Sequence, residues 1–401
     1  MSILSGKHIL LGITGSIAAY KAADLASKLT QAGAKVDVIL TGAGEKFVTP
    51  LTYQSVTGHK AYTDKDLWGD EAHVLHVSLG KTADLLVIAP CTADTMAKLT
   101  HGIADNLLTV TALAATCPIL IAPAMDGGMF DHPATQANLK TLQTRGVLVA
   151  GPAAGHLASG MSGVGRMLEP MDILGHIRIA LGKNGKLAGK KIIVTAGGTQ
   201  EAIDPVRVIT NHSSGKQGYA LAQAALDAGA EVTLITTPTA LTPPVGANVV
   251  NVKSVQDMLD TLLNENADAL IMAAAGADFR PVSVAKDKLK KRDGIPQIQL
   301  EAAPDILKTL ASQSGVQRRF KVTVGFAAES RDLLANASEK LASKNLDFIA
   351  ANDISASDAG FAVETNRITL LFANGTQEIL PLMSKSEVAE KIIEHIARLL
   401  E

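Results

Sequence analysis

The sequence has few cysteines, few aromatic residues and almost no net charge. Its two cysteines, Cys91 and Cys117, exclude a dense disulfide framework and favour a reducing, cytoplasmic location. The formal net charge of -2 lacks the basic excess of a nucleic-acid binder. No apolar run reaches the ~18 residues of a membrane span, and the first ten residues lack the layout of a secretory signal. We therefore expect neither nucleic acid nor a membrane among the partners of this protein.

What the sequence does contain is aliphatic residues and glycine, in a pattern that repeats. Hydrophobic residues make up 47% of its 401 residues, a length that suggests two domains. Residues 8–41 read as strand, glycine turn, helix, glycine stop and strand, and residues 191–199 with 218–237 repeat this order. Such alternation predicts an α/β fold with two doubly wound, Rossmann-like domains. We place them at 1–181 and 190–401, joined by a Gly- and Lys-rich linker at 182–189.

Polar residues follow the predicted strands of the first domain. In GITGSIAAYK, Gly15 and Ser16 lie at a strand-to-helix turn, where exposed amides suit a phosphate. The turn is not GxGxxG, and a turn that serves only packing remains an alternative. Thr92 and Thr95 in APCTADT could bind a phosphate or a ring edge, or could cap a helix. His73 and His76 make a metal pair conceivable, but no third ligand with zinc spacing is nearby.

Another segment, GHLASGMSGVGRM at 155–167, is rich in glycine and costs much entropy to order. By itself it could be a connector loop. Together with TGSIAAYK, HVSLGKTADLLVIAP, PCTADTMAKLTHGIADNLL and PAMDGGMFDHPATQANL, which precede it in that order, it resembles the flavin-containing cysteine decarboxylases. The resemblance covers nearly all of residues 6–180 and implies a flavodoxin-like flavoprotein domain. It also implies that the glycine-rich segment is a flap that closes over flavin and substrate.

The resemblance assigns roles to several residues. It implies that His76 is the active-site histidine and that the PAM segment with Met125, together with Arg166, binds substrate. It implies oxidation of the substrate's thiol before CO2 leaves, so that the resulting carbanion is delocalised onto sulfur. The residues that would surround FMN are Gly15, Ser16, Ile17, Thr41, Thr92 and Thr95.

Two positions depart from the family's pattern. Asp126 stands where the PAM motif usually has asparagine, and Ser159 stands where the flap usually has the cysteine credited with the last protonation. A carboxylate beside the substrate's carboxylate would repel it unless it is protonated or turned towards an amide N–H. A serine hydroxyl is a much weaker acid than a thiol. We expect the complete reaction, with water or His76 as proton donor. The alternatives are an oxidative decarboxylase that stops at the ene-thiol, or a non-catalytic flavin-binding domain.

In the second domain, a long connection follows the first strand, and long ordered loops are usually functional. Its SSGKQG is not a P-loop, because Gln217 follows Lys216 where that motif needs Ser or Thr, but the helix start could still bind a phosphate. The basic run KDKLKKRDG at 286–294 is either a solvated face or a polyphosphate-binding segment.

The second domain resembles the phosphopantothenate–cysteine ligases over residues 190–401. The motifs are GGTxExIDPVRxITNxSSGKxG, ADFRP, KLKK, APDIL, GFAAE and KNLDFIAAND. The resemblance implies that Asn211 and Arg207 hold an acyl-cytidylate or phosphopantothenate, and that Mg2+ is bound mainly through the phosphates of CTP. The residues that would bind CTP and phosphopantothenate further include Ala273, Ala274, Asp278, Lys288, Pro304, Asp305, Ile306, Leu307, Phe326, Lys340 and Lys344, with Lys288 and Asn211 acting catalytically.

Together the two resemblances predict a bifunctional enzyme of coenzyme A biosynthesis. It would join L-cysteine to 4'-phosphopantothenate with CTP and then decarboxylate the product to 4'-phosphopantetheine. An NAD(P) oxidoreductase is a weaker alternative because GxGxxG is absent, and a flavin prenyltransferase would lack the PAM segment. The resemblance also implies a homo-oligomer, with trimeric flavin domains and dimeric ligase domains, as in a dodecamer.

Overall fold

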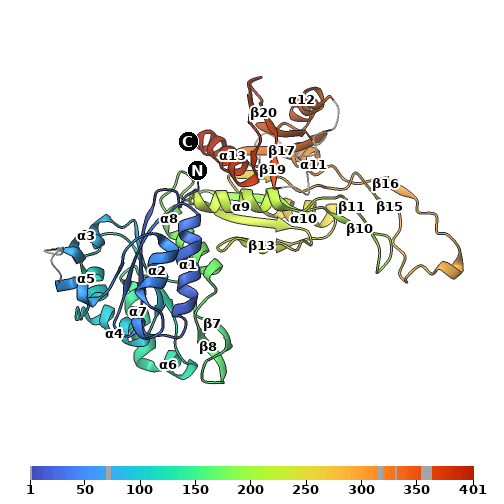
Figure 1. Cartoon of the computed structure of the whole chain (residues 1–401). Helices are drawn as coiled ribbons and strands as arrows, with labels where there is room; N and C mark the ends of the chain where they lie inside the picture. Colours follow the sequence, from blue (N-terminus) through green and yellow to red (C-terminus); the bar gives the residue numbers. More distant parts are fainter. Residues whose placement is uncertain (1, 69–73, 314–318, 330–331, 354–363) are drawn as a thin grey trace. The chain divides into compact units, whose positions relative to one another are not determined.

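The computed structural model describes residues 2–68, 74–313, 319–329, 332–353 and 364–401. The chain divides into two compact units, Met1–Gly182 and Lys183–Glu401, each built around its own sheet (Figure 1). Leu187 is fully buried in the core of the second unit, so the segment after Gly182 already belongs to that unit. Within the described ranges, every helix is too short or too polar to cross a bilayer.

The first unit contains a parallel sheet whose strands are buried on both faces. All six residues of β1 are buried, as expected for a strand covered by helices on both sides. In spatial order the strands are β3 (Ala61–Tyr62), β2 (Lys35–Leu40), β1 (His8–Ile13), β4 (Leu85–Cys91), β5 (Ile119–Pro123) and β6 (Leu148–Val149). A two-stranded antiparallel sheet, β7 (Ala153–His156) and β8 (Ser162–Arg166), follows in the chain.

Helices cover both faces of this sheet, and their apolar residues recur at helical spacing. One core contains side chains of α1 (Ala19–Gln31), α2 (Pro50–Thr57) and α8 (Pro170–Gly182). The core on the other face contains side chains of α3 (Leu75–Thr82), α4 (Ala93–His101), α5 (Leu107–Ala114) and α7 (Pro133–Thr144). Three short helical segments complete the unit: η1 (Gly44–Lys46), η2 (Asp64–Trp68) and α6 (Gly127–Asp131).

The second unit contains a larger sheet that starts parallel and ends with an antiparallel hairpin. The sequence predicts this hairpin around Asn374 and Gly375, and the structure has it there. In spatial order the strands are β13 (Asn248–Asn251), β12 (Glu231–Thr236), β9 (Lys191–Ala196), β14 (Ala269–Met272), β17 (Val322–Glu329), β18 (Phe348–Asp353), β20 (Ile368–Phe372) and β21 (Gln377–Ile379). Strands β13 to β18 of this order are parallel.

Two helices cover one face of this sheet and three the other. The first core contains α9 (Lys216–Asp227) and α13 (Lys385–Leu400). The opposite cores contain α10 (Val255–Asn264) with α11 (Ile306–Gln313), and α12 (Leu333–Ser343). The small sheets are β10 (Gln200–Ala202) with β11 (Val208–Thr210), β15 (Phe279–Pro281) with β16 (Leu300–Ala302), and β19 (Thr365–Asn366) with β22 (Met383–Ser384); a short 3-10 helix, η3 (Lys291–Asp293), lies between β15 and β16.

One predicted strand is shorter than its apolar run. The sequence ADALIMAAAGADFRP predicts a strand whose end turns polar at Asp278, but β14 ends at Met272. The chain then bends, because the N–H of Ala275 donates to the carbonyl of Gly197 (2.8 Å) instead of continuing the ladder with β17. Residues 282–299 form an arm, defined here as the connection between β15 and β16, which extends away from the large sheet (Figure 1).

Candidate functional site

The first unit has a pocket of about 600 Å³ at the carboxyl edge of its parallel sheet. This edge is where open α/β sheets bind ligands. The pocket is lined by the segments that follow β1, β2, β3, β4 and β5: Gly15, Ser16, Thr41, Gly42, Ala43, Asp64, Thr92, Ala93, Asp94, Thr95, Lys98, Asp105, Asn106, Ala124, Met125 and Met129.

Hydrogen bonds of buried hydroxyls fix the turns that form this pocket. Thr14 Oγ1 donates to the carbonyl of Pro90 at 2.7 Å and accepts the N–H of Thr92 at 3.1 Å, so the turns after β1 and β4 are tied together. Thr92 also caps α4, since its Oγ1 accepts the N–H of Thr95. In the structure Thr92 therefore caps a helix, as one alternative predicted, and it also lies on the pocket wall.

Close packing requires glycine at position 15. A Cβ on Gly15 would lie 2.6 Å from the Cβ of Ala43, which is closer than side chains approach. Beside it, Thr41 is buried, donates to the carbonyl of Ile13 and accepts the N–H of Gly44. The turns after β1 and β2 are thus packed directly against each other.

The charged residues of the pocket are paired with one another or with backbone. Asp64 accepts the N–H of Gly42 at 3.3 Å and that of Leu107 at 2.9 Å. Lys98 contacts Asp105 at 3.0 Å and Asp94 at 3.3 Å, and the bond to Asp105 raises the pKa of the Lys98 ammonium. The lining includes three acidic residues and one cation, so this pocket is acidic before any ligand binds.

The glycine-rich segment predicted as a flap is the β7–β8 hairpin with its tip at 157–161. Its second strand lies against the segment after β5, because the N–H of Met125 donates to the carbonyl of Gly165 at 3.0 Å. A Cβ on Gly165 would lie 2.4 Å from the carbonyl oxygen of Met125, so glycine is needed for this approach. The hairpin therefore packs beside Met125, a residue of the pocket wall.

The two residues that depart from the decarboxylase pattern contact each other. Ser159 Oγ, at the hairpin tip, donates to Asp126 Oδ2 at 2.6 Å, and Asp126 Oδ1 accepts the N–H of Gly128 at 3.0 Å. The Ser159 bond, and then the Gly128 bond, lower the pKa of the Asp126 carboxyl. Asp126 is therefore an ionised helix cap for α6, and it already accepts hydrogen bonds from two N–H or O–H groups.

A second contact joins the base of the hairpin to α1. Glu169 Oε1 accepts from Arg166 Nη2 and from Lys21 Nζ, each at 2.7 Å. The hydrogen bond from Lys21 contributes most to the lowered pKa of the Glu169 carboxyl. Arg166 is exposed and lies outside the pocket lining in this arrangement.

The structure brings most of the residues predicted around FMN into one place. Gly15, Ser16, Thr41, Thr92 and Thr95 line the pocket, as does Met125. Ile17 lies beside them but points largely to solvent, with 57% of its surface exposed. His76, the second residue of α3, is half-buried and is not among the lining residues; Asp126, Ser159 and Arg166 are also outside the lining. His73 lies outside the described residues.

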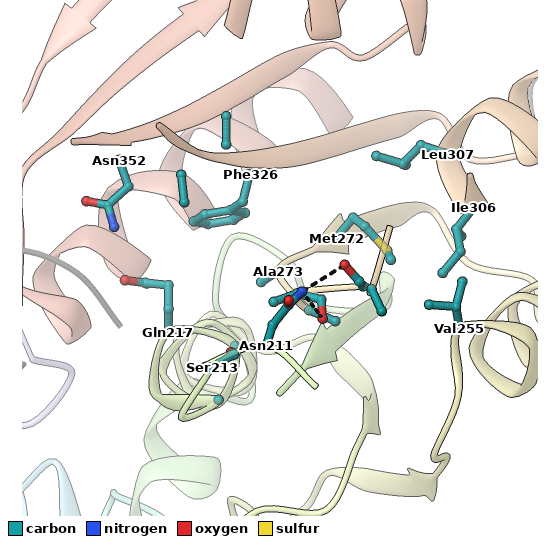
Figure 2. A pocket seen from close by; sticks show the side chains of 18 of the residues that line it. Asn211, Ser213, Gln217, Val255, Met272, Ala273, Ile306, Leu307, Phe326 and Asn352 are labelled. Carbon is teal, nitrogen blue, oxygen red and sulfur yellow. Dashed lines mark hydrogen bonds between the residues drawn. The ribbon is translucent and has the colours of Figure 1, made fainter. Parts of the chain in front are cut away.

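The second unit has a pocket of about 710 Å³ (Figure 2). Elements far apart in the sequence line it: the start of α9, the segment after β14, the start of α11, and the strands β17 and β18. Its residues include Asn211, Ser213, Ser214, Lys216, Gln217, Val255, Met272, Ala273, Ala274, Asp278, Pro304, Asp305, Ile306, Leu307, Phe326, Lys340, Lys344, Asn352, Asn366 and Lys385.

The segment after β14 is held in place by two buried hydroxyls. Thr195 Oγ1 accepts the N–H of Ala274 at 3.0 Å, and Thr199 Oγ1 accepts the N–H of Ala277 at 2.9 Å. Both threonines are fully buried. Because these bonds fix the backbone after the strand end, residues 273–278 form a wall of the pocket rather than a continuation of the sheet.

Asn211 is tied to this wall. Its Nδ2 donates to the carbonyl of Gly276 at 2.9 Å and to that of Ala275 at 3.4 Å, as the dashed lines in Figure 2 show. The side-chain amide of Asn211 therefore uses its donors on the protein, and its oxygen is the part left for a ligand.

The start of α9 fits an anion. Gly215 is its N-cap, with φ of 78° and no side-chain capping bond. A Cβ on Gly218 would lie 2.5 Å from that of Ala196, so this glycine allows the helix to pack directly on β9. The sequence interpretation of SSGKQG as a phosphate-binding helix start, rather than a P-loop, agrees with this geometry.

The pocket lining is cationic. It includes four lysines and two aspartates, and Lys344 Nζ contacts Asp305 at 3.1 Å. The sequence singled out Lys340 and Lys344 but not Lys216 or Lys385. Within the described residues there is no group of three or more His, Cys, Asp or Glu side chains placed to hold a metal ion.

Two predicted ligase residues lie away from this pocket. Lys288 is exposed on the arm, and Arg207 is exposed in the connection between β10 and β11. Arg207 contacts the residue that follows Lys288: its Nη1 donates to Asp204 at 2.8 Å and to the carbonyl of Leu289 at 3.1 Å. Asp204 also accepts the N–H of Leu289 at 3.1 Å. This cluster, which the sequence did not indicate, fixes the arm at Leu289, near its middle, to the β10–β11 connection.

The comparison with known proteins covers both units. The family model "Flavoprotein" matches residues 2–181, and the model "DNA/pantothenate metabolism flavoprotein C-terminal domain" matches residues 187–400. The coenzyme A biosynthesis bifunctional protein CoaBC of Bacillus subtilis (strain 168) is 44% identical over 99% of this chain and 98% of its own length. That of Vibrio vulnificus (strain CMCP6) is 45% identical over the whole of both chains. The chain belongs to the CoaBC family.

Solved structures similar to each half also exist. The crystal structure of the C-terminal domain of a CoaBC protein is 41% identical, with a TM-score of 0.46, and covers 54% of this chain and 98% of that one. A PPC decarboxylase mutant complexed with pantothenoylaminoethenethiol is 34% identical, with a TM-score of 0.40, and covers 43% of this chain and 97% of that one.

Membership of the CoaBC family confirms the resemblance found in the sequence. It also confirms the predicted roles, a decarboxylase and a ligase of coenzyme A biosynthesis in one chain. The α/β fold class is confirmed by the structure itself: the large sheet of the first unit is parallel, and that of the second is parallel except for its last two strands. The assignment of individual residues to the two reactions stays a prediction.

Proposed function

We propose that the second unit joins L-cysteine to 4'-phosphopantothenate with CTP, and that the first unit decarboxylates the product with FMN. The observation that supports this most is the pair of pockets in a CoaBC chain. One is cationic and opens at a helix N-terminus, and the other is acidic and lined by hydroxyls and backbone. The cationic pocket of the second unit suits a triphosphate. The acidic pocket of the first unit suits a group held mainly by hydrogen bonds and shape.

In the ligase reaction the pantothenate carboxylate attacks the α-phosphate of CTP. The new C–O–P bond forms as the bond to pyrophosphate breaks, and the acyl-cytidylate results. The cysteine amine then attacks the acyl carbon, loses a proton and displaces CMP. Lysines of the pocket stabilise the charge on the departing pyrophosphate, and Mg2+ shares it through the phosphates. Asn211, with its donors fixed on the wall, presents its amide oxygen to the cysteine amine or to the hydroxyl of the pantothenoyl group.

The ligase is tested by the products of the purified full chain with CTP, Mg2+, L-cysteine and 4'-phosphopantothenate. We expect CMP and pyrophosphate in equal amounts. CDP would contradict the acyl-cytidylate. Asn211→Asp should slow turnover with the fold intact, and Lys288→Gln should lower the rate by roughly tenfold or more if the arm reaches the reacting groups. An unchanged rate would remove the substituted residue from the site.

The first pocket fits FMN. Its volume of about 600 Å³, the half-buried turn at Gly15 and Ser16, and the hydroxyls of Thr92 and Thr95 match a phosphate and a ring edge. When bound, FMN would supply the two-electron oxidation of the substrate's thiol, after which loss of CO2 leaves charge delocalised onto sulfur. The residues of this chain would bind the phosphate, orient the ring and, through the hairpin, exclude water.

Asp126 suggests how the substrate is held. As an ionised cap it would repel the carboxylate that leaves as CO2, so we propose that it accepts the substrate's amide N–H instead. Arg166, released from Glu169, is the cation that would approach the substrate's carboxylate or phosphate. His76 lies outside the pocket lining, and we propose that substrate or a neighbouring subunit extends the site to this histidine.

Ser159 favours a second candidate, an oxidative decarboxylase that stops at the ene-thiol. Its hydroxyl donates to Asp126, which makes it a still poorer acid for the last protonation. We favour the complete reaction, with water or His76 as donor. The two are separated by mass spectra of the products made with and without oxygen. The ene-thiol is lighter by two hydrogens. Ene-thiol alone under anaerobic conditions would overturn the complete reaction, and Ser159→Cys should suppress any aerobic leak of it.

We also propose a homo-oligomer, with trimeric first units and dimeric second units. Ile17 and Tyr20, around the start of α1, expose 57% and 61% of their surfaces, and Trp68 exposes 89%. Large apolar side chains exposed in this way suit a subunit interface. Light scattering of the full chain would test it, and a monomer at micromolar concentration would contradict it.

A further inference from the structure

Thr199 is a fully buried residue of the second unit that lies outside the lining of the ligase pocket. It ends the GGT sequence between β9 and β10. Its Oγ1 accepts the N–H of Ala277 at 2.9 Å, and its own N–H donates to the carbonyl of Ala275 at 3.1 Å. Thr199 therefore holds the pocket wall at 273–278 in two places, once with its hydroxyl and once with its backbone.

The part of the wall that Thr199 holds is the part to which Asn211 is tied. Asn211 Nδ2 donates to the carbonyls of Gly276, at 2.9 Å, and Ala275, at 3.4 Å (Figure 2). The carbonyl of Ala275 thus accepts both from the backbone of Thr199 and from the side chain of Asn211. The backbone of Asn211 is in contact with the same segment, because a Cβ on Gly198 would lie 2.8 Å from its carbonyl oxygen.

The direction of the Asn211 amide follows from these carbonyls. Asn211 is exposed, and the last torsion of an asparagine side chain is broad and roughly two-fold, so the amide has no fixed direction of its own. A carbonyl oxygen only accepts hydrogen bonds, so the NH2 group of the amide must face the two carbonyls. Asn211 Oδ1 then points away from the wall. If the carbonyls shift, the amide loses the contacts that distinguish its oxygen from its nitrogen.

We propose that Thr199 is a positioning residue of the ligase reaction. It holds the carbonyls of Ala275 and Gly276 where they accept from Asn211, and it thereby directs Asn211 Oδ1 towards the substrate. The inference rests on the role proposed above for Asn211. In Thr199→Val a methyl group replaces the hydroxyl, and the N–H of Ala277 loses its acceptor. A buried N–H without an acceptor is unfavourable, so the wall should move away from the arrangement that fixes Asn211.

The test is a double-mutant cycle on the full chain, with kcat measured as CMP formation at saturating CTP, Mg2+, 4'-phosphopantothenate and L-cysteine. We expect Thr199→Val to lower kcat roughly tenfold, because small displacements of a group that positions substrate are costly. Thr199→Ser keeps the hydroxyl and should stay within about twofold of the wild type. Added to Asn211→Ala, Thr199→Val should lower kcat by less than about twofold more, since the side chain that it positions is gone.

Thr236→Val is the matched control. Thr236 is a buried threonine of the same unit, at the end of β12 and outside the pocket lining, and its Oγ1 donates to the carbonyl of Thr237 at 3.1 Å. Both valine variants lose a buried hydrogen bond and should have a lower Tm than the wild type. Only Thr199→Val should lower kcat.

Several results would overturn the proposal. They are an unchanged kcat in Thr199→Val, a Thr199→Ser variant as slow as Thr199→Val, and losses that multiply in the double variant with Asn211→Ala. A merely structural role of the hydroxyl gives the last of these. If Thr199→Val does not fold, Thr199→Ala goes through the same cycle, and multiplying losses there equally overturn it. Full kcat in Asn211→Ala would instead reject the role proposed for Asn211, and with it the inference.

Discussion

The two pockets of this CoaBC protein lie at the same place in related folds, yet their charges are opposite. Each opens at the carboxyl edge of a parallel sheet, beside a glycine turn that starts a helix. The first is lined by three acidic residues and one lysine, the second by four lysines and two aspartates.

The difference shows how one architecture serves two ligands. In the first pocket the polar groups are already satisfied, as Asp64 is by the N–H groups of Gly42 and Leu107. A ligand there gains from shape, hydroxyls and backbone. In the second pocket four lysines line the cavity. An anionic ligand there would gain from charge as well as from hydrogen bonds.

The largest effect is expected from filling the tight turn of the first pocket. Gly15→Val would place side-chain atoms against Ala43, so the affinity for FMN should fall roughly hundredfold by overpacking. Absorbance of bound flavin after gel filtration measures it. Gly42→Ala is the control, because a Cβ there meets only Asp64 Oδ2, at 3.7 Å. Equal flavin loss in both variants would show that the turn is merely unstable.

A matched pair of lysine substitutions tests the charge difference. Lys344→Met should raise the Kd for CTP about tenfold, because it removes a cation from the cationic pocket. Lys98→Met should change FMN affinity less than about twofold, since Asp94 and Asp105 already neutralise this lysine and both are exposed to water. A large loss of FMN with Lys98→Met would mean that the two pockets bind their ligands alike.

A smaller effect concerns the pH dependence of decarboxylation. The hydrogen bond from Ser159 lowers the pKa of Asp126 in the folded protein, so the carboxylate and its bonds persist above that pKa and are lost as the pH falls through it. Ser159→Ala should raise the pKa of Asp126 and move the acid limb of kcat/KM to higher pH. Rates measured in buffers between about pH 3 and 7 would show this shift of the acid limb. Identical acid limbs would remove Asp126 from the reaction.

The smallest effect should come from salt alone. Raising ionic strength screens charges, so binding of CTP should weaken several-fold between low salt and about 0.5 M, while binding of FMN should hardly change. Calorimetry of the same preparation with both ligands measures it. Parallel loss of both affinities would contradict the assignment of opposite charge to the two pockets.

The parts of the molecule that could be predicted from the sequence are those encoded locally. Strand ends followed by Gly15 and Ser16, or by Thr92 and Thr95, are short motifs. A parallel sheet brings them together because the carboxyl ends of its strands lie at one edge. Asn366 and Lys385 could not be found this way. They meet Gln217 only because β19 and α13 return to the start of α9, across some 150 residues of chain.

The basic run of the arm shows a second limit of local patterns. Composition and position after a strand end left a solvated face and a polyphosphate-binding segment as alternatives, and only the resemblance implied that Lys288 binds CTP. In the structure β14 ends early and Lys288 lies outside the pocket lining, so its role stays a prediction. What fixes the arm is Asp204, whose pKa is lowered by backbone N–H groups and Arg207 despite the opposing effect of burial. No local pattern reveals that an aspartate accepts bonds from a residue 85 positions away.

Among the residues that the structure describes, each core cluster belongs to one unit, and none is shared across Gly182 and Lys183. The chain can therefore be cut at this junction without opening either interior. Two separately expressed halves should fold, and together they should restore growth to a cell that lacks the fused gene. Fusion of the two units in one polypeptide is thus not needed for either core to form.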